Sequence, residues 1–551
     1  MNSDPLWYKN AVFYEIYVRA YYDANADGNG DLPGLMSKLD YLEKLGVDCL
    51  WLLPIYPSPL LDGGYDIADY YGIHPDYGNL EDFKRLLDAA HDRDMRVITD
   101  LVLNHTSDQH PWFQEARADR NSPYRDYYVW SDTEKKYDNA RIIFIDTEHS
   151  NWTWDEIAGQ YYFHRFYASQ PDLNYDNPVV QEEMMKIISY WLDLGVDGFR
   201  ADAVPYLFER EGTNCENLSE THIFLKKLRR FIDENYPGRV LLSEANQWPK
   251  DVRPYFGEGD EFQMAFHFPV MPRIFMALRQ GDVTPITWIL SETPPIPPQC
   301  QWVTFLRNHD ELTLEMVTPE EREWMWQEYA PDPRMRLNLG IRRRLAPLLN
   351  NDRRLIELAN SLLFTLPGSP IIYYGDEIGM GDNIYLPDRD GVRTPMQWNS
   401  GVNAGFSDAP ENALYSPVIS GPEYGPEAVN VHDQEKDPAS LLNTIQRMIS
   451  ARKSHQAFGW GEFAWVPGDN KAIAAYLRTY QGQVLFIANN LSGQPQEIRL
   501  SMPGALLEGS LVDIFTGERL RDLKDGTLQL HLEPYEYRWM KFQGIGEIDH
   551  G

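Results

Sequence analysis

Eight short apolar runs, separated by helical stretches, recur along this chain. The helical stretches lie at 32–46, 80–94, 180–195, 220–236 and 353–366. The apolar runs span residues 12–18, 47–54, 95–105, 196–202, 239–246, 261–268, 301–311 and 369–379. Strands that are apolar on both faces are typical of a parallel sheet covered by helices, and eight such units favour a closed (β/α)8 TIM barrel. The alternative, a doubly wound sheet, would require a glycine-rich phosphate-binding turn after its first strand, and none is present.

Three stretches depart from this alternation. Residues 106–174 are rich in Trp, Tyr, His and Asp with little helical period, which predicts a small domain inserted after the third strand. Residues 312–352 are predicted to form a helical insertion after the seventh strand, within the barrel domain. Short alternating strands then predict a C-terminal antiparallel β-sandwich at 456–551, which leaves 1–105 and 175–455 as the barrel.

Polar side chains close four of the predicted strands. Because the carboxyl ends of barrel strands meet on one rim, where active sites of this architecture lie, we expect these side chains to form one site. In chain order they are Asn104 and His105, Arg200 and Asp202, Glu244, and His309 with Asp310 and Glu311.

Three of these carboxylates suit the chemistry of sugar bonds, for which two carboxyl groups on either side of the bond are required. Asp202 stands two residues from Arg200, so we expect it to stay ionised, as a nucleophile must. Glu244 has no basic neighbour in its own strand, which suits a proton donor with a raised pKa. Asp310 is available to hold sugar hydroxyls while the ring gains positive charge.

Four segments resemble the signature segments of the α-amylase family of glycoside hydrolases, in order and in spacing. They are DLVLNH (100–105), GFRADAV (198–204), SEAN (243–246) and FLRNHDE (305–311). The resemblance implies a retaining mechanism on α-glucosidic bonds. It implies Asp202 as the nucleophile, Glu244 as the acid/base and Asp310 as the stabiliser of the transition state.

The same resemblance implies a set of sugar contacts. Asp62 would hold the far hydroxyls of a bound glucose, Tyr65 would serve as a stacking platform, and Arg393 would touch the glucose. For Tyr65 and Phe166, ordinary packing is the alternative. The full set is Asp62, Tyr65, His105, Phe166, Gln170, Arg200, His309 and Arg393.

The loop DANADGNGD (23–31) offers oxygen atoms at alternate positions, which is a pattern that suits a hard cation. It resembles the first half of an EF-hand loop, but Gly34 stands where the closing Glu would be, so it is not one. A related family loop binds calcium or magnesium; a plain turn is the alternative. The candidate ligands of this first site are Asp23, Asn25, Asp27, Asn29 and Asp31.

The resemblance implies a second, structural calcium site between the barrel and the inserted domain. Its candidate ligands are Asn104, Asp172, Tyr206, Leu207 and Glu209. We expect no organic cofactor.

Further segments, at 205–222, 307–318, 335–354 and 373–384, resemble family members that isomerise maltose to trehalose with minor hydrolysis to glucose. A hydrolytic α-glucosidase is the alternative, and a catalytically silent sugar-binding protein is disfavoured by the complete carboxylate set. Isomerisation requires a closed pocket in which glucose, and not water, attacks the glucosyl–Asp202 intermediate. The candidate lid contacts are Arg141, Tyr206, Asn246, Glu311 and Glu315.

Charge and composition limit the partners. The net charge of −33 argues against nucleic acid and anionic membranes and fits a neutral disaccharide. The arginine run 342–344, with Arg353 and Arg354, is interpreted as a solvated or domain-pairing helix face. Three cysteines form no disulfide framework, and neither a leader peptide nor an apolar run of ~20 residues is visible, so we expect a cytoplasmic enzyme; a homo-oligomer is left open.

Overall fold

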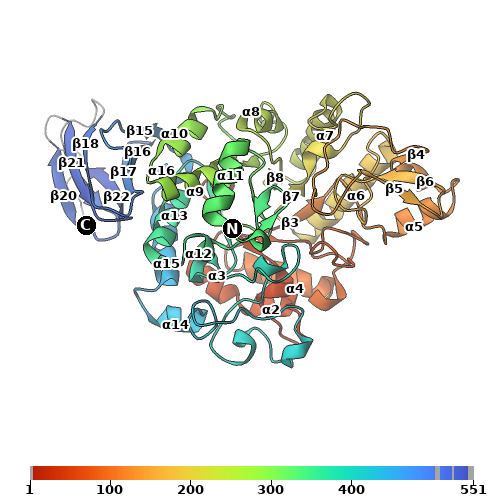
Figure 1. Ribbon diagram of the computed structural model, residues 1–551, viewed down its shortest axis with the longest axis horizontal. Helices are drawn as coiled ribbons and strands as arrows, with labels where there is room; N and C mark the ends of the chain where they lie inside the picture. Colours follow the sequence, from red (N-terminus) through yellow and green to blue (C-terminus); the bar gives the residue numbers. More distant parts are fainter. Residues whose placement is uncertain (1–3, 503–508, 524–525, 544–551) are drawn as a thin grey trace.

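Eight parallel strands close into a barrel in the computed structural model, which describes residues 4–502, 509–523 and 526–543 (Figure 1). Around the barrel the order is β1-β14-β10-β9-β8-β7-β3-β2. Each strand lies within one of the eight apolar runs, so the predicted (β/α)8 barrel is confirmed. The strands are β1 (Phe13–Ile16), β2 (Cys49–Leu52), β3 (Arg96–Val102), β7 (Gly198–Asp202), β8 (Val240–Ser243), β9 (Met264–Phe266), β10 (Gln301–Phe305) and β14 (Ser369–Tyr373).

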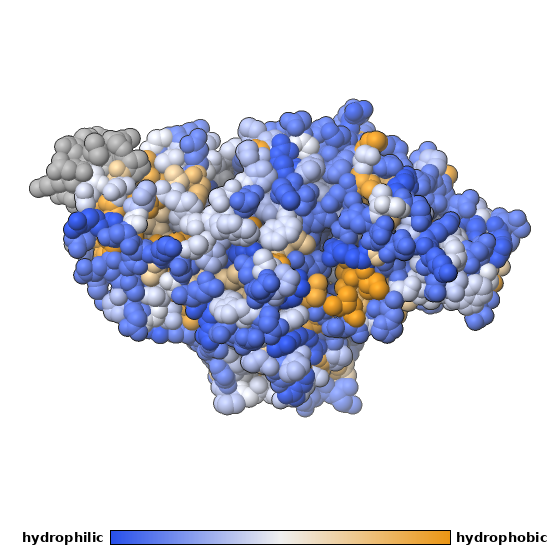
Figure 2. Space-filling view, turned by 45° about the horizontal axis from the view of Figure 1, so that its top comes forward, coloured by the Kyte–Doolittle hydropathy of each residue, from blue (hydrophilic) through white to orange (hydrophobic). Residues whose placement is uncertain are grey.

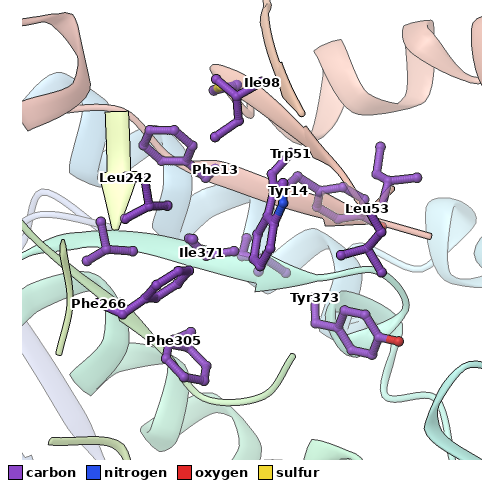
Figure 3. Close-up of a cluster of buried hydrophobic side chains, with 14 of the residues drawn as sticks. Phe13, Tyr14, Trp51, Leu53, Ile98, Leu242, Phe266, Phe305, Ile371 and Tyr373 are labelled. Carbon is purple, nitrogen blue, oxygen red and sulfur yellow. The ribbon is translucent and has the colours of Figure 1, made fainter. Parts of the chain in front are cut away.

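The barrel interior is filled by apolar side chains from these strands (Figure 3). Phe266 lies at the centre of the contacts: its ring centroid is 5.4 Å from that of Phe305 and 5.7 Å from that of Trp51. Phe13, Ile98 and the three aromatic side chains are all buried. A filled interior confines space for a ligand to the ends of the strands.

Helices pack around the barrel, and several of them begin at a residue whose side chain caps the first turn. Asn79 caps the helix at 80–91 in a reciprocal capping box with Asp82. The single helix expected at 32–46 is broken at Lys38, which ends one helix and starts the next. The helices are α2 (Leu32–Ser37), α3 (Leu39–Leu45), α4 (Leu80–His91), α6 (Pro178–Leu194), α7 (Ser219–Asn235), α9 (Val270–Gln280), α10 (Thr284–Ser291), α13 (Arg353–Thr365) and α15 (Leu441–Ser454).

The segment after β3 carries its own small sheet, on the side of the barrel opposite the C-terminal sheets (Figure 1). It contains α5 (Pro111–Ala118) and the antiparallel strands β4 (Trp130–Ser131), β5 (Trp152–Asp155) and β6 (Gln160–Phe163).

The C-terminal segment forms two antiparallel sheets that share one apolar layer. Phe486 from one sheet belongs to the same buried cluster as Ile498 and Leu528 from the other, so the predicted sandwich is confirmed. The predicted domain ranges also include 1–3, 503–508, 524–525 and 544–551, which lie outside the described residues. The larger sheet has β15 (Glu462–Trp465), β16 (Ile473–Tyr480), β17 (Gln483–Asn490), β22 (Tyr537–Gln543), β19 (Gly509–Asp513) and β20 (Arg519–Leu523); the smaller has β18 (Gln496–Ser501) and β21 (Thr527–Leu532).

The insertion after β10 is only partly helical. It has α11 (Pro319–Tyr329) and α12 (Leu345–Leu348), but also a three-stranded sheet of β11 (Leu312–Thr313), β12 (Arg336–Leu337) and β13 (Gly340–Ile341). The arginine run 342–344 lies outside any helix, between β13 and α12, so its interpretation as a helix face is wrong; Arg353 and Arg354 do lie in a helix, at the start of α13.

Two further features concern the cysteines and the apolar character of the helices. Cys49, Cys215 and Cys300 are buried free thiols. Among the helices of the described residues, none combines the length and the apolar character that crossing a bilayer requires.

Candidate active site

One pocket at the carboxyl ends of the barrel strands collects most of the predicted site residues. Gln170, Arg200, His309 and Arg393 lie behind this lining and contact it. The pocket is lined by Asp62, Tyr65, His105, Ile143, Phe144, Phe166, Asp202, Ala203, Tyr206, Glu244, Asn246, Phe268, Asn308, Asp310, Glu311, Thr313, Glu315 and Arg389.

Arg200, which is 1% exposed, binds three carboxylates at once. Its Nη1 lies 2.5 Å from Asp202 Oδ1 and 2.5 Å from Asp100 Oδ1, and its Nη2 lies 2.5 Å from Glu244 Oε1. Glu244 therefore has a basic neighbour, although none stands in its own strand. Strand β8 pairs with β7 in parallel, so the partner of Glu244 comes from the adjacent strand and not from its own.

Burial separates the protonation states of the two central carboxyl groups. It raises the pKa of Asp202 to about 6, although Arg200 opposes the shift. It raises the pKa of Glu244 to about 8, again against Arg200 and with the help of Asp202. Arg200 favours the ionised form of Asp202, as the sequence predicted, but burial has the larger effect on its pKa. Near neutral pH an ionised Asp202 therefore faces a protonated Glu244, and these are the two protonation states that a retaining glycosidase needs.

Asp310 lies among positive groups and stays ionised. Burial would raise its pKa, but His309 and then Arg389 outweigh burial and hold the pKa well below its ordinary range. His309 Nε2 is 3.1 Å from Asp310 Oδ2, and its Nδ1 is 2.5 Å from Glu15 Oε1. Burial would lower the pKa of His309, but Asp310 and Glu15 raise it to about 9, so the imidazole is cationic near neutral pH.

Arg389 is a site residue that the sequence analysis missed. Its Nη2 lies 2.8 Å from Asp62 Oδ1 and its Nη1 lies 2.9 Å from Asp310 Oδ1, so it bridges two predicted sugar-binding carboxylates. Arg393, which was predicted, contacts Asp310 at 3.0 Å, and Gln170 donates to Asp62 at 2.9 Å. The signal was present: Arg389 stands four residues before Arg393 in the same DRDGVR segment (388–393).

Three further predicted contacts surround the carboxylates. Burial lowers the pKa of His105 to about 3, so its ring is neutral, and its buried Nε2 has no hydrogen-bond partner among the described residues. Tyr65 stacks on His309 with centroids 5.3 Å apart and donates to Asp100 at 3.3 Å. The Phe166 ring lies 5.2 Å from that of His105. An unpartnered nitrogen beside aromatic faces suits a sugar, which presents hydroxyls and apolar C–H faces.

Three of the five lid candidates, Arg141, Tyr206 and Glu315, are in contact at the pocket, and the last two belong to its lining. Arg141, from the inserted segment, lies 2.7 Å from Glu315 and donates to the Tyr206 hydroxyl at 3.0 Å. It also binds Glu216 at 2.7 Å, a partner that the sequence analysis missed.

The other two lid candidates make separate contacts. Asn246 donates to Thr313 Oγ1 at 3.0 Å. Glu311 accepts a hydrogen bond from Asn338, another residue that the sequence analysis missed, at 3.2 Å.

The candidate residues of the second metal site leave buried oxygen atoms without partners. Among the described residues, Asn104 Oδ1, Asp172 Oδ2 and Glu209 Oε1 accept no hydrogen bond. Burial raises the pKa of Asp172 to about 7, and burial together with Asp172 raises that of Glu209 well above its usual range. Buried carboxyl groups of this kind require a proton or a cation, and an oxygen-only set with an amide fits calcium.

The loop at 23–31 gives no such sign. Asp23 accepts hydrogen bonds from the backbone of Ala26 and Gly28, at 2.7 and 2.8 Å. Asp31 accepts from the backbone of Gly34 at 2.6 Å, and Asn29 accepts from Arg19 at 2.9 Å. No group of three or more His, Cys, Asp or Glu placed to hold a metal occurs in the described part of the chain, so this first site stays a prediction.

Comparison with known proteins agrees with this geometry. The family described as "Alpha amylase, catalytic domain" matches residues 15–329 and 341–461, and "Maltogenic Amylase, C-terminal domain" matches 463–539. Trehalose synthase/amylase TreS of Mycobacterium tuberculosis is 60% identical over 507 residues, which cover 91% of this chain and 84% of that protein. Oligo-1,6-glucosidase of Parageobacillus thermoglucosidasius is 31% identical over 604 residues, covering 98% of this chain and 100% of that protein.

A solved structure with the same architecture is that of trehalulose synthase MutB from Pseudomonas mesoacidophila MX-45. Its TM-score is 0.77 at 26% identity, covering 98% of this chain and 99% of that one. The family matches span most of the barrel and the C-terminal sheets, and they confirm the resemblance of the four strand-end segments. The chain therefore belongs to the α-amylase family.

Proposed function

We propose that the protein isomerises maltose to trehalose, exchanging an α-1,4 for an α-1,1 glucosidic bond, with minor hydrolysis to glucose. The observation that carries the proposal is a complete set of carboxylates for a retaining mechanism in one pocket, where Arg141 of the inserted segment forms an ion pair with Glu315 of the lining. Relatives named trehalose synthase, 58–60% identical over 91% of this chain, support the same activity.

The reaction proceeds by double displacement. The Asp202 carboxylate attacks the anomeric carbon of maltose, while Glu244 gives its proton to the departing glycosidic oxygen. The freed glucose stays in the pocket and turns, and its 1-hydroxyl then attacks the glucosyl–Asp202 ester as Glu244 takes back the proton. Asp62, Asp310 and Arg389 hold the ring that carries the ester.

The hydrolytic α-glucosidase remains the alternative, and the products separate the two. Incubating the protein with maltose and resolving the sugars by chromatography should give mainly trehalose, with a minority of glucose. Near-complete conversion to glucose, with no trehalose, would replace the proposal by the alternative.

The proposed acid and base predict a bell-shaped pH profile. Activity requires Asp202 to be ionised, so kcat/KM falls as the pH drops through its pKa of about 6. It requires Glu244 to be protonated, so kcat/KM falls as the pH rises through its pKa of about 8. We expect a maximum between these limits when maltose consumption is followed across pH. A rate that is constant from pH 5 to pH 10 would contradict the assignment.

We also propose that the second metal site holds a structural calcium ion. The Asn104, Asp172 and Glu209 side chains would bind it, together with backbone carbonyls of Tyr206 and Leu207. The ion would neutralise the buried carboxylates and tie the inserted segment to the barrel, and it would take no part in the chemistry. Calcium or magnesium in the 23–31 loop is proposed on the sequence pattern alone.

Chelation should therefore lower the melting temperature, because a ligand that binds only the folded state stabilises it. Scanning calorimetry with and without a calcium chelator measures the effect. Glu209→Gln should reduce the fall in melting temperature that the chelator causes, because it removes the second site, whereas Asp27→Asn in the first loop should leave the part of that fall due to the second site in place. If Glu209→Gln retains the full response, the ion does not sit at the second site.

Location and partners follow from charge and chemistry. A cytoplasmic enzyme is supported by the free buried thiols, and its substrate would be a disaccharide. The charge of −33 disfavours nucleic acid and anionic membranes as partners.

A further inference from the structure

Arg342 donates to backbone carbonyls of a segment that is distant in sequence. Its Nη1 lies 2.7 Å from the carbonyl oxygen of Leu386 and 2.5 Å from that of Asp388, and its Nη2 lies 3.2 Å from that of Ile384. We call residues 382–393 the strap. A guanidinium presents its N–H donors in a rigid planar fork. These hydrogen bonds therefore fix the orientation of the strap relative to Arg342 as well as its distance from Arg342.

The strap carries Arg389, and its backbone needs external support. Asp388 adopts a left-handed conformation with φ of +41°, which costs energy in a residue other than glycine. Such conformations persist only where the surroundings hold them, and the carbonyl of Asp388 is one of those that Arg342 binds. The next residue, Arg389, extends from this point to Asp62 and Asp310.

The segment that carries Arg342 is itself hydrogen-bonded to the chain that directly follows Asp310. Strand β11 begins at Leu312, two residues after Asp310, and pairs with β13. Arg342 follows β13 directly, and its backbone N–H donates to the carbonyl of Met335 at 2.8 Å. A closed circuit of contacts therefore runs from Asp310 through the small sheet to Arg342, along the strap to Arg389, and back to Asp310.

The neighbouring arginines hold the beginning of the same strap. Arg343 Nε lies 2.9 Å from one carboxylate oxygen of Asp382 and 3.0 Å from the other. The backbone N–H of Arg344 donates to Asp382 at 2.7 Å. Arg342 and Arg343 thus bind the strap through their side chains and Arg344 through its backbone N–H, and Arg342 is nearest to the residue that reaches the pocket.

We propose that Arg342 is a positioning residue for substrate binding: it holds the strap so that Arg389 bridges Asp62 and Asp310 where the sugar ring is bound. Arg342 itself touches no substrate. The proposal rests on glucosyl transfer through this pocket, but not on whether glucose or water accepts the glucosyl group.

A double-mutant cycle with Arg389 tests this. Cleavage of nitrophenyl α-glucoside and consumption of maltose are followed for Arg342→Ala, Arg389→Ala and the double variant. We expect Arg342→Ala to lower kcat/KM about 10- to 100-fold, mainly through KM, since a misplacement of about 1 Å can cost on the order of 10²-fold. In the Arg389→Ala background the same change should cost less than about twofold, because its effect passes through Arg389.

Arg336→Ala is the matched control. Arg336 stands on β12 of the same small sheet and donates to the carbonyl of Ala330 at 2.9 Å, so its loss should leave kcat/KM within about twofold of the parent. Arg342→Lys keeps the positive charge but not the forked arrangement of donors, so it should raise KM less than Arg342→Ala does. If the alanine variant does not fold, the double-mutant cycle is measured with Arg342→Lys instead.

Two outcomes would overturn the proposal. The first is a kcat/KM for both Arg342 variants within about twofold of the parent; the second is an equal loss in the parent and in the Arg389→Ala background. If the parent cleaves the nitrophenyl glucoside but makes no trehalose from maltose, the proposed isomerase activity is refuted. The double-mutant cycle can still be measured with the nitrophenyl glucoside.

Discussion

Replacing Asp202 by Asn, or Glu244 by Gln, should lower turnover of maltose by a factor on the order of 10⁴ or more. The first change removes the nucleophile and the second removes the proton that the departing oxygen needs. Both variants keep the volume of the side chain, and Arg200 retains two of its three carboxylate partners in either one. Circular dichroism and the melting temperature should therefore show a folded protein.

Asp193→Asn is a suitable control, because Asp193 is exposed on α6 and does not line the pocket. Its rate should equal that of the parent. A rate within tenfold of the parent for either site variant would remove that residue from the mechanism. An experimental structure should place the two carboxyl groups about 5–5.5 Å apart, and a separation above about 6.5 Å would indicate inversion instead.

Breaking the Arg141–Glu315 ion pair should change which acceptor takes the glucosyl group. We call this ion pair the roof of the pocket. Arg141→Ala and Glu315→Ala each remove it, so we expect water to enter and to compete better with the retained glucose. We expect the ratio of glucose to trehalose formed from maltose to rise about tenfold, which corresponds to about 1.4 kcal/mol in the competition between the two acceptors. Chromatography of the products at low conversion measures the ratio.

Labelled free glucose provides an independent readout of closure. In the parent enzyme it should enter the disaccharide only slightly, and in the two lid variants it should enter readily. Arg117→Ala is the matched control, because Arg117 forms a 2.7 Å ion pair with Asp155 in the same inserted segment, away from the pocket lining. Equal product ratios in the parent, the lid variants and this control would show that the roof does not exclude water.

The barrel could be predicted, and the three candidate catalytic carboxylates could be located at one rim of it, because both follow from local patterns. Each strand has its own apolar run, and each catalytic carboxylate stands at the end of one. The contacts and pKa shifts that the sequence did not reveal depend on residues from neighbouring strands of the sheet. The contact between Arg200 and Glu244 requires the pairing of β7 with β8, and the pKa of Asp202 requires the depth of burial, and neither can be read along one strand.

The loops were predicted less well than the strands. Arg389 and Arg393 lie in one segment with similar chemistry, and only the fold shows that Arg389 bridges Asp62 and Asp310. The arginine run 342–344 looked like a solvated face, because its partners are mostly backbone carbonyls and a carboxylate some forty residues away. Hydrogen bonds to carbonyls leave no mark in a sequence.

The barrel's closing seam has a consequence for biosynthesis. Strand β1 pairs with β14, so Phe13 finds its partner only when Ile371 has been made. At about 5–20 residues per second, the ribosome needs roughly 20–70 s to cover that interval. During it one edge of β1 is unpaired, and for most of it Glu15 lacks its ion-pair partner His309, which has not yet been made. An unpaired strand edge favours aggregation, so we expect the nascent chain to be exposed to it until β14 has been made, and the barrel that carries the pocket can close only after that point.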